Sequence, residues 1–166
     1  MHEVASAYGA DDQTQDASAA VQRHVCNDIA LRRSLRCCHR VLASQASFKP
    51  PLIMAAIRTN STVFKCLSSS GFVAIHVLGA DQQETAQRFF FPTQASDGCI
   101  NGEPFTDGVN GVPILPNMPA HVECRVVRIL ADVGDHAVVL FEVVEAACRD
   151  VVRPLTIAES PWQYGG

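Results

Sequence analysis

The stretch Gly134-Asp135-His136, followed at once by AVVLFEVV over 137–144, decides how the rest of this chain is interpreted. The eight-residue run is rich in β-branched residues and predicts a largely buried strand. The polar triplet in front of it sets Asp135 and His136 at the mouth of that strand, so we expect their side chains to point toward a site. The alternative is a turn with an exposed histidine, which is the commoner setting for a single histidine.

Composition indicates one globular domain with ordinary fractions of hydrophobic and charged residues. The chain has 166 residues, 48% of them hydrophobic and 18% charged, which is enough to bury a core without disulfides or metals. The formal net charge of −4 argues against nucleic-acid binding by the chain as a whole. No apolar run approaches the length of a membrane span, and the acidic N-terminus lacks the apolar core of a secretory signal. We therefore expect no membrane partner.

The seven cysteines are odd in number and lack the spacing of a disulfide framework, which predicts reduced thiols and a cytoplasmic location. One cluster, Cys37-Cys38-His39, contains metal-binding residue types. Adjacent cysteines rarely fit one tetrahedral site, and no CxxC pair accompanies them, so we expect no metal site.

We divide the chain into an N-terminal segment, residues 1–40, and a β-rich domain, residues 41–166. We predict that residues 1–20 form a loosely held tail. The arginine-rich residues 21–40 should form either a basic helix or an irregular segment that leads into the domain. We predict helices over 62–69, with Gly71 as C-cap, and from an Asp81 cap with Glu84 through Phe89. Residues 93–120 predict a long loop. Strands are predicted over 52–57, 72–78, 122–127, 137–147 and 155–157.

These elements lack a long alternating series of strands and helices. They predict a mainly β fold, a barrel with short helices appended to it.

The usual signatures of hydrolases, P-loops, zinc proteases and Rossmann dinucleotide sites are absent from the chain. Hydroxyl groups and one guanidinium instead gather at strand ends. Ser44-Gln45-Ala46-Ser47 precedes the strand over 52–57, and Arg58, Asn60 and Ser61 follow it. Serine hydroxyls and backbone N–H groups beside an arginine suit a phosphate monoester. On spacing alone, the use of these residues as turn formers is the commoner case.

Several short segments occur in a recognisable order. They are SQASFKPPLI at 44–53, AIR at 56–58, SGF at 70–72, VLG at 77–79, DQ at 81–82, RF at 88–89, INGEPF at 100–105, EC at 123–124, GDH at 134–136, PLT at 154–156, and Trp162 with YGG at 164–166. In this order they resemble the flavin reductase-like FMN-binding family, and within it the flavoredoxin-like branch. The resemblance covers residues 41–166.

The resemblance implies an FMN-binding split barrel, here with its N-terminal strand missing or displaced, that forms a homodimer with FMN near the interface. It implies hydride transfer to flavin from NADH or NADPH. By position, the stretch Ser44, Gln45, Ala46 and Ser47 would lie along the flavin, and Arg58, Ser61 and Arg88 would face its phosphate. His136, with Asp135 beside it, would border the nicotinamide pocket and position the ring. Trp162 or Tyr164 would cover a flavin edge or simply dock the tail on the barrel.

Three functions are compatible with this resemblance. The first is an NAD(P)H-dependent FMN reductase, an oxidoreductase that can serve a monooxygenase or another electron acceptor. The second is a flavoredoxin-like electron carrier that keeps its FMN. The third is a degenerate family member that no longer binds flavin. In the first two, the flavin carries the redox chemistry and the protein holds and orients it. The first is our expectation.

Overall fold

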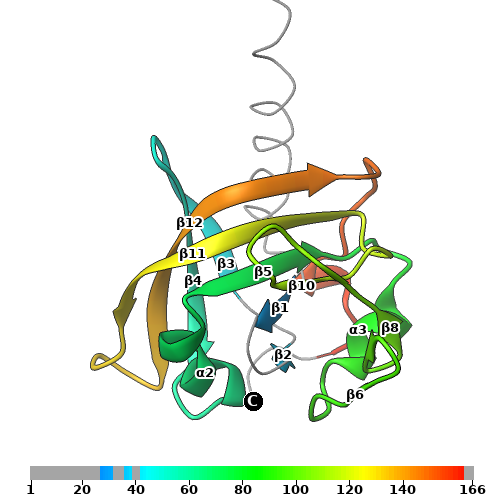
Figure 1. The fold of residues 1–166 in the computed structure, drawn as a ribbon, viewed down its shortest axis with the longest axis horizontal. Helices are drawn as coiled ribbons and strands as arrows, with labels where there is room; N and C mark the ends of the chain where they lie inside the picture. The colour runs from blue at the N-terminus through cyan, green and yellow to red at the C-terminus, as the bar shows by residue number, and fades with distance from the viewer. Residues whose placement is uncertain (1–26, 32–35, 39–41, 163–166) are drawn as a thin grey trace, which may run out of the picture.

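The computed structural model describes residues 27–31, 36–38 and 42–162. In this part of the chain seven strands form one antiparallel sheet in the order β2-β1-β5-β11-β12-β4-β3, which is strongly curved (Figure 1). The mainly β fold class expected from the sequence is confirmed. The strands are β1 Asn27–Leu31, β2 Arg36–Cys38, β3 Leu42–Phe48, β4 Pro51–Arg58, β5 Phe72–Val77, β11 Ala120–Leu130 and β12 His136–Cys148.

The main hydrophobic core lies on one face of this sheet. Ile53, Ile75 and Phe141, from three different strands, are fully buried in it. Strand β5 is buried on both faces, because Ile75 joins the main core while Ala74 joins a second cluster. This explains why β5 is apolar at every position except His76 and does not alternate; the buried His76 Nε2 accepts a hydrogen bond from the Leu115 N–H at 3.0 Å.

Helix α2 (Thr62–Ser70) follows β4 and confirms the predicted helix over 62–69. The hydroxyl of Ser61 caps its N-terminus by accepting a hydrogen bond from the Phe64 N–H at 3.1 Å. The helix ends at Gly71, whose φ of 71° lies in the left-handed region that glycine adopts without strain. Val63 and Leu67 pack into the main core, so the cap and the core fix this helix together.

The N-cap of helix α3 (Gln83–Arg88) lies one residue later in the chain than predicted. The expectation that Asp81 caps it was wrong. Gln82 stands at the N-cap position without a side-chain cap, and its Oε1 accepts from the Gly79 N–H at 2.8 Å, which shapes the preceding turn instead. Among the helices of the described residues, none has the length and apolar character needed to span a membrane.

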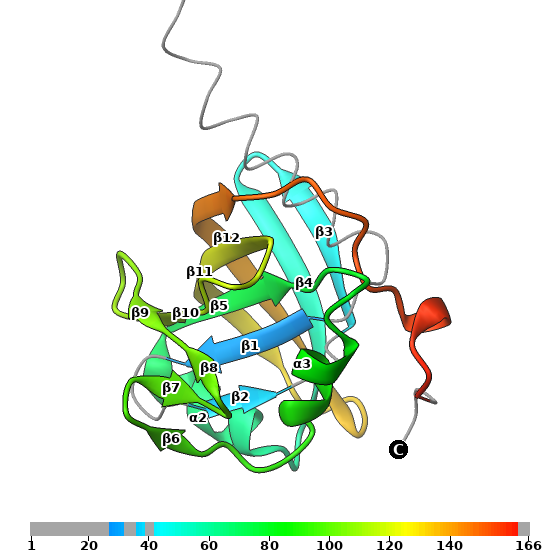
Figure 2. The same cartoon turned by 90° about the vertical axis from the view of Figure 1, so that its right-hand side faces the viewer.

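The segment predicted as a long loop over 93–120 is more regular than expected. It forms a three-stranded sheet of β6 (Ala95–Ser96), β7 (Cys99–Ile100) and β8 (Glu103–Pro104), and a two-stranded sheet of β9 (Thr106–Asp107) and β10 (Pro113–Ile114). Figure 2 shows these short strands and α3 gathered on one side of the large sheet. Their apolar residues form the second core with the outer face of β5.

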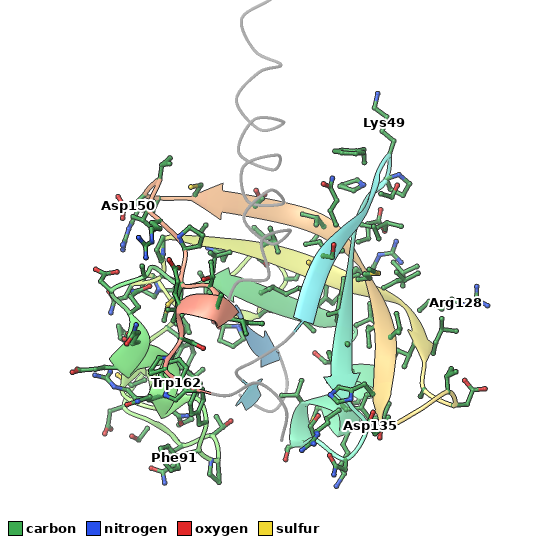
Figure 3. All side chains as sticks on the ribbon, turned by 180° about the vertical axis from the view of Figure 1, so that it is seen from behind. Lys49, Phe91, Arg128, Asp135, Asp150 and Trp162 are labelled. Carbon is green, nitrogen blue, oxygen red and sulfur yellow. The ribbon has the colours of Figure 1, made fainter. Side chains whose placement is uncertain are left out.

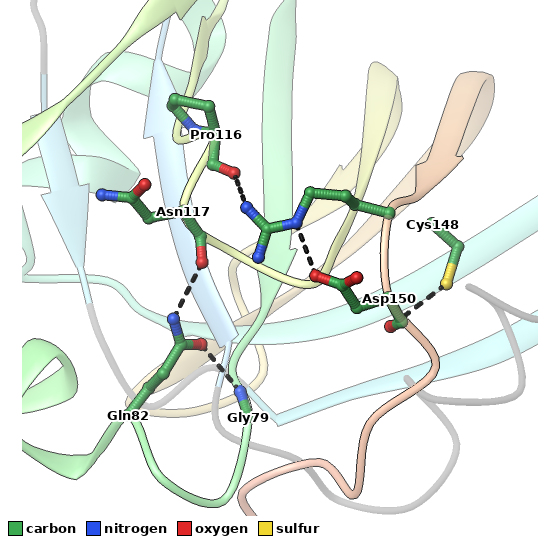
Figure 4. Close-up of polar contacts among 7 residues, drawn as sticks. Gly79, Gln82, Pro116, Asn117, Cys148 and Asp150 are labelled. Carbon is green, nitrogen blue, oxygen red and sulfur yellow. Dashed lines mark hydrogen bonds and ion pairs between the residues drawn. The ribbon is translucent and has the colours of Figure 1, made fainter.

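The segment between β10 and β11 is tied to two distant parts of the chain (Figure 4). The Gln82 side chain donates to the carbonyl of Asn117 at 2.9 Å. The Arg149 guanidinium donates to the carbonyl of Pro116 at 2.5 Å. The first contact joins this segment to the start of α3, and the second joins it to the residue after β12.

The secondary structure predicted for two further segments was wrong. Residues 21–40 are neither helix nor irregular where the structure describes them, because β1 and β2 pair with each other and β1 pairs with β5. A strand therefore occupies the place where the sequence predicted a missing or displaced one. Pro154 makes only an isolated bridge to Gly79, and Ile157–Glu159 form the 3-10 turn η1 in place of the short strand over 155–157.

Candidate functional site

Pairing of β4 with β12 brings together two residues that lie far apart in the sequence. Arg58 ends β4 and His136 begins β12, and the two are direct cross-strand partners. Side chains of such partners emerge on the same face of a sheet. The His136 side chain is 36% exposed, so it remains accessible to a ligand at the open end of the strand pair.

Asp135 accompanies His136 as expected. Its carboxylate Oδ1 lies 3.0 Å from His136 Nδ1, and its side chain is 85% exposed. The hydrogen bond and the charge of His136, with a smaller contribution from the charge of Arg58, lower the pKa of the Asp135 carboxyl below its ordinary value. Asp135 is thus held ionised beside the imidazole, where its carboxylate can orient the ring.

The turn after Arg58 leads directly into α2. The Ser61 N–H donates to the Arg58 carbonyl at 3.0 Å, which closes the turn. Ser61 then caps the helix, so Arg58 and Ser61 stand together at the N-terminus of α2. The first N–H groups of a helix lack partners within the helix, and its dipole favours anions there. A guanidinium, a hydroxyl and a helix N-terminus form a donor set that fits a phosphate group.

The stretch Ser44, Gln45, Ala46 and Ser47 lies on β3, an edge strand beside β4. Ser44 pairs with Met54 and Ser47 with Leu52, with an irregularity at Ala46, whose side chain is exposed. Met54 precedes Arg58 by four residues, or about 13 Å along the strand. The serine stretch therefore starts about that far from Arg58 and leads away from it along the same hairpin.

Arg88 does not join this group within one copy of the chain. Its Nη1 donates to Glu103 Oε1 at 2.6 Å, and the side chain of Glu103 is only 8% exposed. Helix α2 precedes β5 and α3 follows it, so the two helices lie at opposite ends of that strand. Figure 3 shows Asp135 on one side of the molecule and Phe91, just beyond α3, on the other.

A surface pocket of about 550 Å³ lies beside α3, away from His136. Arg88 lines it together with Glu84, Gln87, Phe91, Pro92, Gln94 and Asn101. Trp162, considered as a flavin cover, packs edge to face on Phe90 with ring centroids 4.8 Å apart. Its other proposed role, docking of the tail, matches this contact. Tyr164 lies outside the described residues.

Within the part of the chain that the structure describes, no three histidine, cysteine or acidic side chains gather as metal ligands. His39 of the Cys37-Cys38-His39 cluster lies outside that part. Cys66, Cys99, Cys124 and Cys148 are free thiols. Burial raises the pKa of the Cys124 thiol, so it stays protonated and unreactive.

The face of β4 and β12 that points away from the main core carries apolar side chains, although it is exposed to solvent. Met54 and Val138 are 43% and 40% exposed, and Leu130 of β11 is 42% exposed. Leu140 pairs with Met54, and Val138 pairs with both Ala56 and Leu130, so these side chains are neighbours. We call Met54, Ala56, Leu130, Val138 and Leu140 the outer apolar face. An antiparallel sheet with one solvated face normally alternates apolar and polar residues.

Comparison with known proteins identifies the family. The profile of the flavin reductase like domain matches residues 40–161. The chain belongs to the flavin reductase-like domain family. A flavin reductase (NADH) from Kitasatospora aureofaciens is 36% identical over 115 residues, which are 68% of this chain and 59% of that protein. The FMN reductase (NADH) SmoA from Agrobacterium fabrum is 37% identical over 111 residues, 64% of this chain and 59% of that protein.

The fold of this flavin reductase-like chain is confirmed independently. Nitrilotriacetate monooxygenase component B from Mycobacterium thermoresistibile superposes with a TM-score of 0.67 at 23% identity, covering 86% of this chain and 80% of that one. The split barrel expected from the sequence is therefore correct. The chain spans 59% of the length of the two curated relatives.

Sequence reasoning missed two residues near these sites. Thr59, between Arg58 and Ser61, contacts Asp135, and Glu103 holds Arg88. Thr59 stood next to residues already singled out, but only the β4–β12 register shows its partner. Glu103 lay in the segment predicted as a loop, where nothing indicated that its carboxylate would be buried.

Proposed function

We propose that this chain is an FMN-binding NAD(P)H:flavin oxidoreductase that transfers hydride from reduced nicotinamide to FMN. Family membership supports this, as do the names of the two curated relatives, both NADH-dependent flavin reductases. NADH is the nicotinamide in both names. The observation in the structure that carries the proposal is the pairing of Arg58 with His136, which sets a phosphate-binding group and a histidine at one strand end.

Arg58, Ser61 and the N-terminus of α2 would hold the FMN phosphate through charge-assisted hydrogen bonds. Ser44, Gln45, Ala46 and Ser47 would line the flavin along the β3–β4 hairpin. Arg88 would contribute to the phosphate site only from a second copy of the chain, since within one copy it lies on α3, at the other end of β5 from Arg58 and Ser61.

When bound, FMN supplies the hydride-accepting chemistry. His136 would border the nicotinamide and orient it, since correct placement of reacting groups is the main task left to the protein. Asp135 would hold the imidazole of His136 in one orientation through the 3.0 Å contact to Nδ1. In this proposal His136 and Asp135 position the nicotinamide, and neither transfers a proton.

The test is a titration of the purified protein with FMN, followed by anaerobic mixing with NADH or NADPH while flavin absorbance is recorded. We expect saturable FMN binding and bleaching by at least one nicotinamide. Colour that persists with both would contradict the proposal and indicate an electron carrier. Absence of flavin binding would indicate a degenerate member of the family.

Arg58→Ala tests the phosphate site in the same assay. Loss of a charge-assisted hydrogen bond should raise the Kd for FMN by roughly ten- to a hundredfold. Arg153→Ala is the matched control, because Arg153 is 71% exposed and pairs with Glu159 on another part of the surface. Equal affinities for the Arg58 variant and wild type would remove Arg58 from the phosphate site.

We further propose that the outer apolar face is the homodimer interface. The face borders Ser44 through its cross-strand partner Met54, so FMN along β3 would lie near the interface. We also propose that a monooxygenase accepts the electrons, since the similar structure named above is a monooxygenase component. We place the activity in the cytoplasm, where free thiols such as Cys66 and Cys99 persist.

A further inference from the structure

The turn between β4 and α2 is attached to the start of β12 through one residue. The Thr59 N–H donates to the Asp135 carbonyl at 3.0 Å, which extends the β4–β12 ladder by one step beyond Arg58 and His136. The Thr59 hydroxyl donates to the same carbonyl, also at 3.0 Å. A single acceptor thus receives two donors from one residue.

This double contact connects the two halves of the candidate site. On one side, Thr59 lies between Arg58 and the turn that ends in the Ser61 cap. On the other side, Asp135 contacts His136 through its side chain. The backbone N–H alone would hold the strand ends together. The hydroxyl adds a second bond to that carbonyl, which restricts rotation of the peptide group that joins Asp135 to His136.

We propose that Thr59 is a positioning residue whose hydroxyl fixes Asp135, and through it His136, at a set distance from Arg58 and Ser61. The consequence for catalysis rests on the proposed function, because it assumes one ligand that contacts both halves. The placement of Asp135 itself does not depend on any ligand. Thr59 touches no reacting atom in this proposal and acts only through Asp135.

The central variant is Thr59→Val, which keeps the branched shape and the backbone N–H but removes the hydroxyl. Thr59→Ser keeps a hydroxyl and is the conservative rescue, and Thr59→Ala is a second hydroxyl-free variant if valine disturbs folding. Thr106→Val is the matched control, because Thr106 is exposed on β9 with no side-chain hydrogen bond to the described residues. Circular dichroism and the melting temperature would verify that each variant folds.

The first readout needs no flavin. NMR titration of the Asp135 carboxyl should show its low pKa in wild type, Thr59→Ser and Thr106→Val, because the contact with His136 is kept. In Thr59→Val and Thr59→Ala the pKa should rise toward the ordinary value of about 4, because a less restrained peptide loosens the contact between the Asp135 carboxylate and His136. An unchanged titration in both hydroxyl-free variants would overturn the proposal.

The second readout is the rate of flavin reduction by NADH. Loss of one hydrogen bond that acts through positioning should lower kcat/KM for NADH by about two- to tenfold, with the Kd for FMN unchanged within about twofold. Thr59→Ser should restore the rate, and an equal loss in Thr59→Ser and Thr59→Val would contradict a role for the hydroxyl. If wild type itself reduces no flavin, the proposed function fails, while the Asp135 titration still decides the role of Thr59.

Discussion

At the scale of single residues, Arg58 and Arg88 show how differently two arginines of the same predicted role can be placed. Arg58 stands opposite His136 at an open strand end. Arg88 is held by Glu103, a carboxylate that is almost entirely buried and also accepts from Asn117. The family resemblance implied that both face the phosphate, because each lies within a segment of the family pattern. It could not indicate that Glu103, fifteen residues from Arg88, provides a competing partner.

His136 and Asp135 yield a prediction about ionisation. In His136→Ala, the Asp135 carboxyl loses its hydrogen bond and its charged neighbour, so its pKa should rise toward about 4. The measurement is a carboxyl NMR titration of wild type and variant. An Asp135 pKa that stays low in His136→Ala would show that His136 is not the cause of the shift.

The same contact has a defined effect on stability. The pKa of Asp135 is lowered in the folded protein, so its contribution to stability is present above the ordinary pKa of aspartate. That contribution is lost as pH falls through the lowered value, because the carboxylate is then protonated. The stability difference between wild type and His136→Ala should therefore shrink on acidification below pH about 4. Urea unfolding across this pH range measures it.

At the scale of elements, Glu123 of β11 organises the turn between β9 and β10. Glu123 is 2% exposed, and its carboxylate accepts from the Val109 N–H at 3.1 Å and the Asn110 N–H at 3.2 Å. Gly108 approaches it so closely that an added Cβ would stand 2.5 Å from Glu123 Oε1. The turn and the carboxylate therefore fit only without a side chain at position 108.

Gly108→Ala should destabilise the protein by about 1–3 kcal/mol, because the methyl group must displace a buried, hydrogen-bonded carboxylate. Gly134→Ala is the matched control, since nothing lies within 4 Å of the position of its added Cβ. Its effect should stay within about 0.5 kcal/mol or slightly stabilise. Chemical denaturation of both variants tests this, and similar stabilities for the two would refute the close approach at Gly108.

Local signals explain which elements were predictable. Helix α2 carries its own cap at Ser61 and its own stop at Gly71, so the sequence was sufficient. Strand β12 carries a long apolar run. The strands β1 and β2 carry no such pattern, and their pairing depends on β5, more than 40 residues away. The short strands between 95 and 114 depend on covering the outer face of β5, which no local pattern reveals.

At the scale of the whole molecule, the register of β3, β4 and β12 decides the site. Pairing of β3 with β4 places the serine stretch on the same hairpin as Arg58, and pairing of β4 with β12 sets Arg58 opposite His136. The sequence indicated each group separately, and the family resemblance indicated that they belong together. Their actual order across the sheet comes only from pairing between distant strands. The same register collects the outer apolar face on three adjacent strands.

The outer apolar face gives a prediction about assembly. If a second copy covers it, Val138→Glu would bury a carboxylate without a partner, which costs on the order of 3 kcal/mol or more and should weaken self-association by about a hundredfold or more. Sedimentation equilibrium over a range of concentrations measures this. FMN affinity should fall together with dimerisation, because Ser44 and Met54 lie at the edge of the same face.

Val151→Glu makes the same change at a valine that is 93% exposed beyond the end of β12. It should leave both the association constant and FMN binding as in wild type, because that side chain already faces water. If Val138→Glu and Val151→Glu associate equally well, the outer apolar face does not form the interface. Any dimer that persists in Val138→Glu would then have to form through another face of the barrel.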